Sequence, residues 1–404
     1  MLREMRPIAE TKPRRSSTPP LPGAKAPHAP TKTAPTAAPE NPQPKLPTQP
    51  STSVGGRAVL GPGLVQCVRV AGRDVDVLLP AGSSFSSYVD GLLKSGVFAD
   101  QKEALTRLAS SSSSLAPGRS DARPTVGIVL SEPSMLLAGG HRNTENLIAL
   151  VESMGCRPVL IPPCADLGVR GGPHARTRIV AAMAGSLDGL VGPGGADVDP
   201  RLYGEANTAA LNTNLARDRF EADFIRRALD CDLFAFGICR SHQLWNAAAG
   251  GSLIQDVQSE EVVSVSHKEG HHPVEFTRKS MIYEEVRQRA LLVNSLHHQA
   301  VDFAGWGFRV VGRVTDEHTG RSMIEATERW NGITTQFHPE LMQDESAHRA
   351  LLGTLGRRAH AFAALKQMGA PTLRSFVAHL RADPRFQKSD VDWAQRELGR
   401  RLPP

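Results

Sequence analysis

The sequence predicts an α/β protein built on a mostly parallel sheet with helices on both faces. The first observation is a set of short, continuous apolar runs, typical of strands buried on both faces, at 125–130, 158–161, 187–191 and 233–238. The second is that stretches with helical spacing of apolar residues separate these runs, at 144–154, 176–185 and 217–231. Strand–helix–strand units of this length connect parallel neighbours by right-handed crossovers, which gives the predicted class.

The segments around this core predict further elements. Asn143 is a suitable N-cap for the first helix and Gly155 a suitable stop. Alternating apolar residues predict an antiparallel extension at 260–267, 272–277, 308–315 and 322–328, and a buried strand follows at 331–337. Short strands are expected within 57–81, a helical pair at 84–109, a long helix at 347–368 and two helical patterns within 372–402.

Composition divides the chain into four parts. Residues 1–50 hold 13 of the 30 prolines and no Phe, Trp or Tyr, so they cannot bury enough apolar surface to offset their ordering entropy. We therefore expect a disordered, Pro-rich basic tail at 1–55. A small extension and linker follow at 56–120, with the serine run 110–114 in the linker, then a catalytic domain at 121–352 and a helical C-terminal extension at 353–404.

Charge and composition exclude several classes of protein. Residues 1–50 carry eight Lys or Arg against three acids, so nearly all of the net charge of +6 belongs to the tail. A nucleic-acid enzyme would place basic residues on its folded surface, so no nucleic-acid partner is expected. No apolar run is long enough for a membrane span, and the N-terminus lacks the apolar region of a signal peptide. Five cysteines without CxxC spacing fit free thiols in the cytoplasm.

The strongest chemical signal is Cys239, which stands between an apolar strand and a helix that begins at once. This is the layout of a nucleophile elbow, in which a tight turn holds a side chain above the carboxyl edge of a parallel sheet. The N-terminus of the following helix would lower the pKa of a thiol and stabilise an oxyanion. The alternative is a buried structural cysteine.

Two further segments fit the same chemistry. His338, at the end of the last buried strand, could accept the proton of Cys239, and Glu340 could fix the tautomer of His338. The alternative is an ordinary histidine at a strand exit. The turn 192–195 (GPGG) exposes backbone N–H groups without side chains, as an oxyanion hole requires, although a plain glycine turn would look the same.

Together these segments resemble the class I glutamine amidotransferase family, most closely its γ-glutamyl-γ-aminobutyrate hydrolase-like branch. The likeness spans about residues 124–352 and rests on LDGLVGPGGADVDPRLYGE, RDRFEADFIRRAL, GICRSHQLWNAAAGGSLIQD, VNSLHHQAV and TTQFHPE. It implies a Rossmann-like sheet, with Cys239 as nucleophile, His338 as base and Glu340 as its orienting group. It also implies backbone donors from Arg240 and from Gly194–Gly195, and a loop with His298 beside the substrate.

One residue departs from the family pattern. The elbow normally reads Gly-x-Cys-x-Gly, but Ser241 stands in the last position. We expect the small serine side chain to be tolerated. A metal is not expected at His297–His298, because no Asp, Glu or His partner lies at helical spacing, and no cofactor is expected.

These observations predict a hydrolase that cleaves a small γ-glutamyl amide through a thioester on Cys239. One alternative is a glutaminase subunit that passes ammonia to a separate synthase. Another is a non-catalytic binding or effector protein on an amidotransferase scaffold, with a protein partner bound through the N- or C-terminal extension. The basic leader also resembles the export regions of bacterial effectors that lack a cleavable signal peptide, which gives an alternative location.

Overall fold

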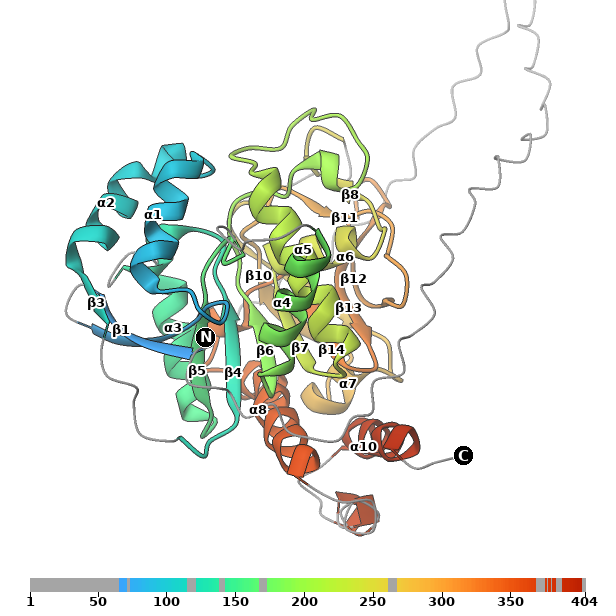
Figure 1. Cartoon of the computed structure of the whole chain (residues 1–404). Coiled ribbons are helices and arrows are strands. Elements are labelled where there is room, and N and C mark those ends of the chain that lie inside the picture. The colour runs from blue at the N-terminus through green and yellow to red at the C-terminus, as the bar shows by residue number, and fades with distance from the viewer. Residues whose placement is uncertain are drawn as a thin grey trace, which may run out of the picture. The chain divides into compact units, whose positions relative to one another are not determined.

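A parallel set of strands forms the centre of one large mixed sheet (Figure 1). Its spatial order is β2-β5-β4-β6-β7-β14, and each neighbouring pair is parallel. The bounds are β2 Arg73–Leu78, β4 Thr125–Val129, β5 Arg157–Ile161, β6 Gly189–Gly192, β7 Phe234–Ile238 and β14 Gly332–Thr335. This arrangement confirms the predicted α/β class with a mostly parallel central sheet.

Antiparallel strands extend the sheet at both ends. Beyond β14 the order is β13-β12-β9-β10, and beyond β2 it is β1-β3, while β11 pairs with β13 and with β8. The bounds are β1 Val65–Val70, β3 Ser112–Ser114, β8 Leu253–Ile254, β9 His271–Phe276, β10 Ala290–Asn294, β11 Ala300–Val301, β12 Arg309–Thr315 and β13 Ser322–Arg329. The predicted antiparallel extension is therefore present.

The structure describes residues 65–70, 73–114, 121–137, 142–166, 173–260, 267–367, 375, 377–378, 380–382 and 387–401. The tail predicted at 1–55 lies outside these residues, as do positions 261–266 of the strand predicted at 260–267. Among the described residues, no helix is long and apolar enough to cross a membrane.

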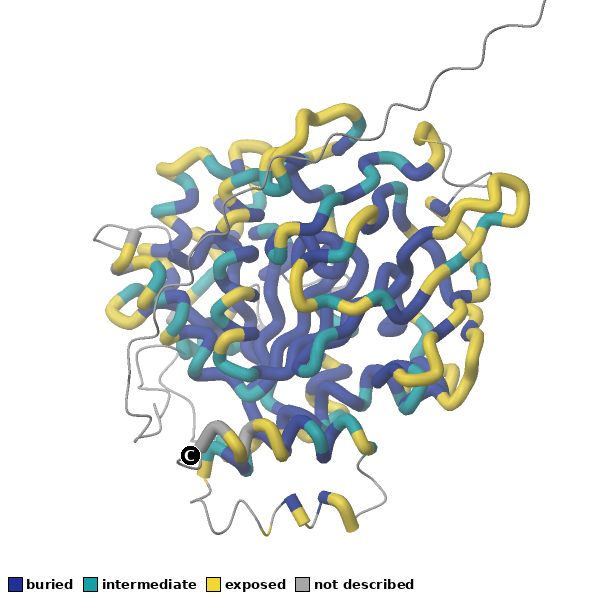
Figure 2. Tube along the Cα trace, turned by 90° about the vertical axis from the view of Figure 1, so that its right-hand side faces the viewer, coloured by how far each residue is buried: buried dark blue, intermediate teal, exposed yellow. Residues whose placement is uncertain are grey.

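Helices cover both faces of the central strands. The helices are α1 Phe85–Ser95, α2 Lys102–Ser111, α3 Arg142–Ser153, α4 Pro173–Gly185, α5 Leu215–Asp230, α6 Arg240–Ala248, α7 Met281–Val286, α8 Ser346–Gln367 and α10 Lys388–Arg401. In β6, a Cβ at Gly189 would lie 3.2 Å from Ala359 in α8, whereas a Cβ at Gly192 would lie 2.7 Å from the Cβ of Ser241 in α6. Residues three apart in a strand face opposite sides, so α8 and α6 cover opposite faces. Every residue of β4 and β7 is buried (Figure 2).

Several short elements were not predicted from the sequence, among them β3, β10 and α7. Residues 112–114, expected in a linker, form β3 because they pair with Val68–Val70 of β1, and serine alone gives no strand signal. Strand β10 is a short strand at the end of the sheet, and α7 is a helix of six residues. Such short elements depend on pairing with distant segments, which local periodicity does not reveal.

The C-terminal helix α10 is fixed to α8 by a buried charge. The Arg358 guanidinium of α8 lies 2.5 Å from Asp390 of α10. It is also stacked near two rings, 5.1 Å from the centroid of Phe234 and 5.2 Å from that of Trp393. Helix α10 is therefore linked to α8, and α8 itself runs continuously across residue 352.

Candidate active site

Cys239 forms the one-residue joint between β7 and α6. Its backbone has φ 48° and ψ −103°, a region that residues with a side chain rarely adopt and that costs about 1–3 kcal/mol. Two backbone hydrogen bonds hold this conformation: the Cys239 N–H donates to Thr335 at 2.7 Å, and its carbonyl accepts from Gln243 at 3.2 Å. Cys239 is buried, with 7% of its surface exposed. This is the strained turn that the sequence predicts at the carboxyl edge of the sheet.

His338 lies at the same edge and interacts with both Cys239 and Glu340. Its Nδ1 lies 2.6 Å from Oε1 of Glu340, which is itself buried. Burial lowers the pKa of His338, but the interactions with Cys239 and Glu340 outweigh it, so the pKa is raised well above its usual value. The imidazole therefore favours its charged form, which a thiolate beside it would stabilise.

Asn294 fixes the backbone of His338. The His338 N–H donates to Oδ1 of Asn294 at 2.8 Å, and Nδ2 of Asn294 donates to the His338 carbonyl at 2.9 Å. Asn294 ends β10, and all of these groups are buried. The backbone of His338 is thus held by Asn294, the last residue of β10, for which sequence analysis predicted no contact with His338.

Gln336 is a second side chain directed at the thiol. Its Nε2 lies 3.6 Å from Sγ of Cys239, and its Oε1 accepts from Nε2 of Gln243 at 3.1 Å. The Gln243 amide also donates to the carbonyl of Gln299 at 3.0 Å, which fixes its orientation. Gln336 lies directly after β14 and two positions before His338, and sequence analysis assigned it no role.

The glycine turn after β6 packs directly against these groups. A Cβ at Gly194 would lie 2.6 Å from Cε1 of His338 and 3.5 Å from the Cβ of Cys239. A Cβ at Gly195 would lie 2.7 Å from Oγ of Ser131 and 3.0 Å from Cδ of Arg240. Glycine is therefore required at both positions by close approach, and the turn lies beside the thiol and the imidazole.

The side chain of Arg240 belongs to a buried ionic network. Its guanidinium lies 2.6 Å from Glu221 and 2.6 Å from Asp218, and Arg217 lies 2.9 Å from the same Asp218. All four side chains are at most 3% exposed. Burial disfavours the charged form of Arg240, but Glu221 and Asp218 outweigh it and raise its pKa. Asp218 also accepts from the Asp199 N–H at 2.7 Å, so the network supports the segment after the glycine turn.

His298 lies beside the same segment, paired with acids. Its Nε2 is 2.8 Å from Oδ2 of Asp197, and its Nδ1 is 3.8 Å from Oδ2 of Asp256. The hydrogen bond with Asp197 raises the pKa of His298. The described structure thus brings Cys239, His338, Glu340 and the glycine turn together, and places His298 on the following part of the turn.

The chain is similar in sequence to several known proteins. The sequence profile of the Peptidase C26 family matches residues 124–340. Protein NtpR of Enterococcus hirae is 32% identical over 184 residues, which are 43% of this chain and 76% of NtpR. Gamma-glutamyl-gamma-aminobutyrate hydrolase PuuD of Escherichia coli is 25% identical over 244 residues, 57% of this chain and 90% of PuuD. A solved glutamine amidotransferase of Thermotoga maritima is 14% identical with a TM-score of 0.37, and the match covers 60% of this chain and 94% of that one. The region matched by the family profile contains both Cys239 and Glu340.

Proposed function

This chain belongs to the Peptidase C26 family, and we propose that it is a cysteine hydrolase that cleaves a γ-glutamyl amide bond. The observation that carries the proposal is the interaction of the buried His338 imidazole with Cys239 on one side and Glu340 on the other. The similarity to a γ-glutamyl-γ-aminobutyrate hydrolase supports the substrate class.

In the first step the Cys239 thiolate attacks the γ-carbonyl carbon of the substrate. The oxygen takes up negative charge, and the backbone N–H groups of Gly195 and Arg240 stabilise it. Glu340 holds the imidazolium of His338 in place, and His338 gives its proton to the leaving amine as the C–N bond breaks. The products are a free amine and a γ-glutamyl thioester on Cys239.

In the second step water attacks the thioester carbonyl. His338, now neutral, takes a proton from this water, and the C–S bond breaks to release glutamate and the thiolate. The reaction cycle ends with the imidazolium–thiolate pair restored. Every step uses a side chain or a backbone donor of this chain.

The proposal is tested by measuring glutamate release from glutamine and from a panel of γ-glutamyl amines. We expect release from at least one γ-glutamyl amine, loss of about 10³-fold or more in Cys239→Ala, and little change in Cys231→Ala. Cys231 is a suitable control because it ends α5 as a half-buried thiol. Folded protein that releases no glutamate from any member would contradict the proposal and favour a glutaminase that works only with a synthase partner.

A further inference from the structure

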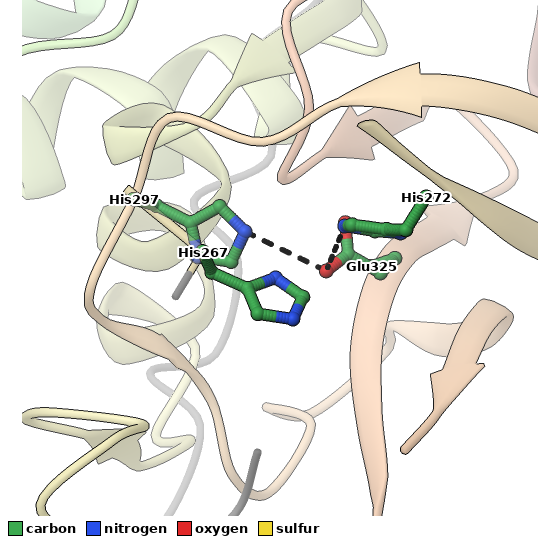
Figure 3. Close-up of side chains that lie close together, drawn as sticks. All are labelled: His267, His272, His297 and Glu325. Carbon is green, nitrogen blue, oxygen red and sulfur yellow. Dashed lines mark ion pairs between the residues drawn. The ribbon is translucent and has the colours of Figure 1, made fainter. Parts of the chain in front are cut away.

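Four potential metal ligands meet among the antiparallel strands of the sheet and the loops next to them. The side chains of His267, His272, His297 and Glu325 each offer one ligand atom, and these atoms all lie within 4.8 Å of one another (Figure 3). His272 lies in β9 and Glu325 in β13, whereas the other two histidines lie in the segments before β9 and after β10. Four separate segments of the chain therefore converge on one point.

Among the residues that the structure describes, the carboxylate of Glu325 has no hydrogen-bond partner. Glu325 is 0% exposed, and neither of its oxygens is hydrogen-bonded. Its Oε1 lies 3.7 Å from Nε2 of His272 and 3.6 Å from Nε2 of His297, and neither nitrogen has another partner. An unpaired buried carboxylate costs several kcal/mol. Two ligands bonded to one zinc ion at 2.0–2.1 Å are roughly 3.4 Å apart in a tetrahedral site, so these distances leave room for an ion.

Hydrogen bonds orient two of the imidazoles for metal binding. Nδ1 of His297 lies 2.9 Å from the carbonyl of Gln299, which can only accept, so Nδ1 carries the proton and Nε2 is free. Oγ of Ser295 donates to the His267 carbonyl at 2.8 Å and lies 3.0 Å from Nδ1 of His267. That nitrogen is therefore the donor to Ser295, and Nε2 of His267 is left free as well. Such partners on the second ring nitrogen are typical of metal-binding histidines.

An ion can reach the cluster from the surface of the protein. His267 and His272 line a cavity of about 900 Å³, which gives an ion a path to the cluster.

We propose that His267, His272, His297 and Glu325 bind one Zn²⁺ ion in a four-coordinate structural site. Imidazole and carboxylate ligands suit zinc, and four protein ligands leave no open position for catalysis. The sequence argued against a metal at His297–His298, because partners were sought at helical spacing. The partners instead come from β9, β13 and the segment before β9, while His298 pairs with Asp197.

The ion would also support the catalytic groups. The Gln336 N–H donates to the carbonyl of Glu325 at 2.8 Å, so the proposed ligand and the neighbour of Cys239 share a backbone contact. His297 follows Asn294, which fixes His338, by only three residues. Zinc would thus fix β13 and the loop after β10, the two segments on which the geometry at the thiol depends.

The test is zinc content and thermal stability of the full chain after chelation, reloading with Zn²⁺ and removal of the excess. We expect about one zinc per chain for wild type and a higher Tm than the metal-free protein. His271→Gln is the matched control, because His271 is the exposed neighbour of His272 in β9. It should keep the zinc, whereas His272→Gln and Glu325→Gln should lose it and show no rise in Tm.

A spectroscopic measurement on wild type tests the site even if a variant fails to fold. Wild type loaded with Co²⁺ should show the strong visible absorption of a tetrahedral site, and folded Glu325→Gln should not. Wild type that retains no zinc after loading would overturn the proposal, and would mean that a protonated Glu325 shares its proton with the imidazoles. Equal zinc content in wild type and in a folded Glu325→Gln/His272→Gln protein would also overturn it, since the ion would then be adventitious.

Discussion

The hydroxyl of Ser241 donates a hydrogen bond to the carbonyl oxygen of Pro193 at 2.8 Å. This bond ties the first turn of α6 to the glycine turn after β6. The serine fits after the nucleophile because Gly192, opposite it, has no side chain. The C=O and N–H of a trans peptide point in opposite directions, so a fixed Pro193 carbonyl also fixes the N–H of Gly194. Ser241 of α6 thus helps to fix the conformation of the glycine turn.

Replacing Ser241 by glycine restores the family pattern but removes this hydrogen bond. We expect Ser241→Gly and Ser241→Ala each to lower the free energy of unfolding by about 1 kcal/mol, with no rise in kcat. Denaturant unfolding and steady-state hydrolysis measure the two effects, with Ser110→Ala on the exposed surface of α2 as the control. A tenfold rise in kcat for Ser241→Gly would mean that the serine impairs the site.

A methyl group at position 194 should displace the imidazole. The Cβ in Gly194→Ala would lie 2.6 Å from Cε1 of His338, so the ring must move. We expect kcat/KM to fall about 100-fold or more, as misplacement of a catalytic group by 1 Å can cost that much. Gly91→Ala in α1, where a Cβ meets no atom within 4 Å, should leave kcat/KM unchanged. Unchanged kinetics in Gly194→Ala would place the reacting imidazole elsewhere.

The raised pKa of His338 predicts a particular pH dependence. The imidazolium is present below the raised pKa and is lost as the pH rises through it, so the basic limb of kcat/KM should lie well above 6.5. Glu340→Gln removes one of the groups that raise this pKa, and the basic limb should move to lower pH. The charged imidazole also stabilises the fold, and this stabilisation has the same pH dependence. It is complete below about pH 6.5 and is lost as the pH rises through the raised pKa of His338.

Profiles of kcat/KM against pH for wild type and Glu340→Gln give the comparison. Glu345→Gln serves as the control, because Glu345 is an exposed acid close in sequence. A basic limb at the same pH in wild type and Glu340→Gln would mean that Glu340 does not raise the pKa of His338.

Removing one charge from the buried ionic network should strongly destabilise the fold. Asp218→Asn removes the negative charge that the guanidinium groups of Arg240 and Arg217 share. We expect the free energy of unfolding to fall by about 3 kcal/mol or more. Asp223→Asn, in the same helix but partly exposed, should cost less than about 1 kcal/mol. The measurement is denaturant unfolding of both variants. A similar small loss in both would show that the network contributes little.

The sequence was sufficient to predict the central sheet, and it pointed to candidate residues that the structure brings together at the edge of this sheet. Buried parallel strands carry continuous apolar runs, so β4 and β7 were recognisable locally. Cys239 and His338 each follow such a strand, and the carboxyl ends of parallel strands lie on one edge of the sheet.

Contacts made between distant segments were not predictable in this way. Asn294 bonds the backbone of His338 across 44 positions, and Gln243 bonds Gln336 across 93. The cluster at Glu325 depends on the antiparallel register of β9 with β10 and β12, and of β12 with β13, which apolar alternation does not fix. Residues at helical spacing from His297 therefore do not include the other members of the cluster, His267, His272 and Glu325.

The central claim is that Cys239 forms a γ-glutamyl thioester, and the most direct measurement is mass spectrometry of the acid-quenched reaction. With a γ-glutamyl amine as substrate, we predict one γ-glutamyl group per chain, located on the peptide that contains Cys239. Glu340→Gln should accumulate less of it, and Cys239→Ala none. A γ-glutamyl group on any of the other four cysteines, or glutamate release without any adduct on Cys239, would contradict the account.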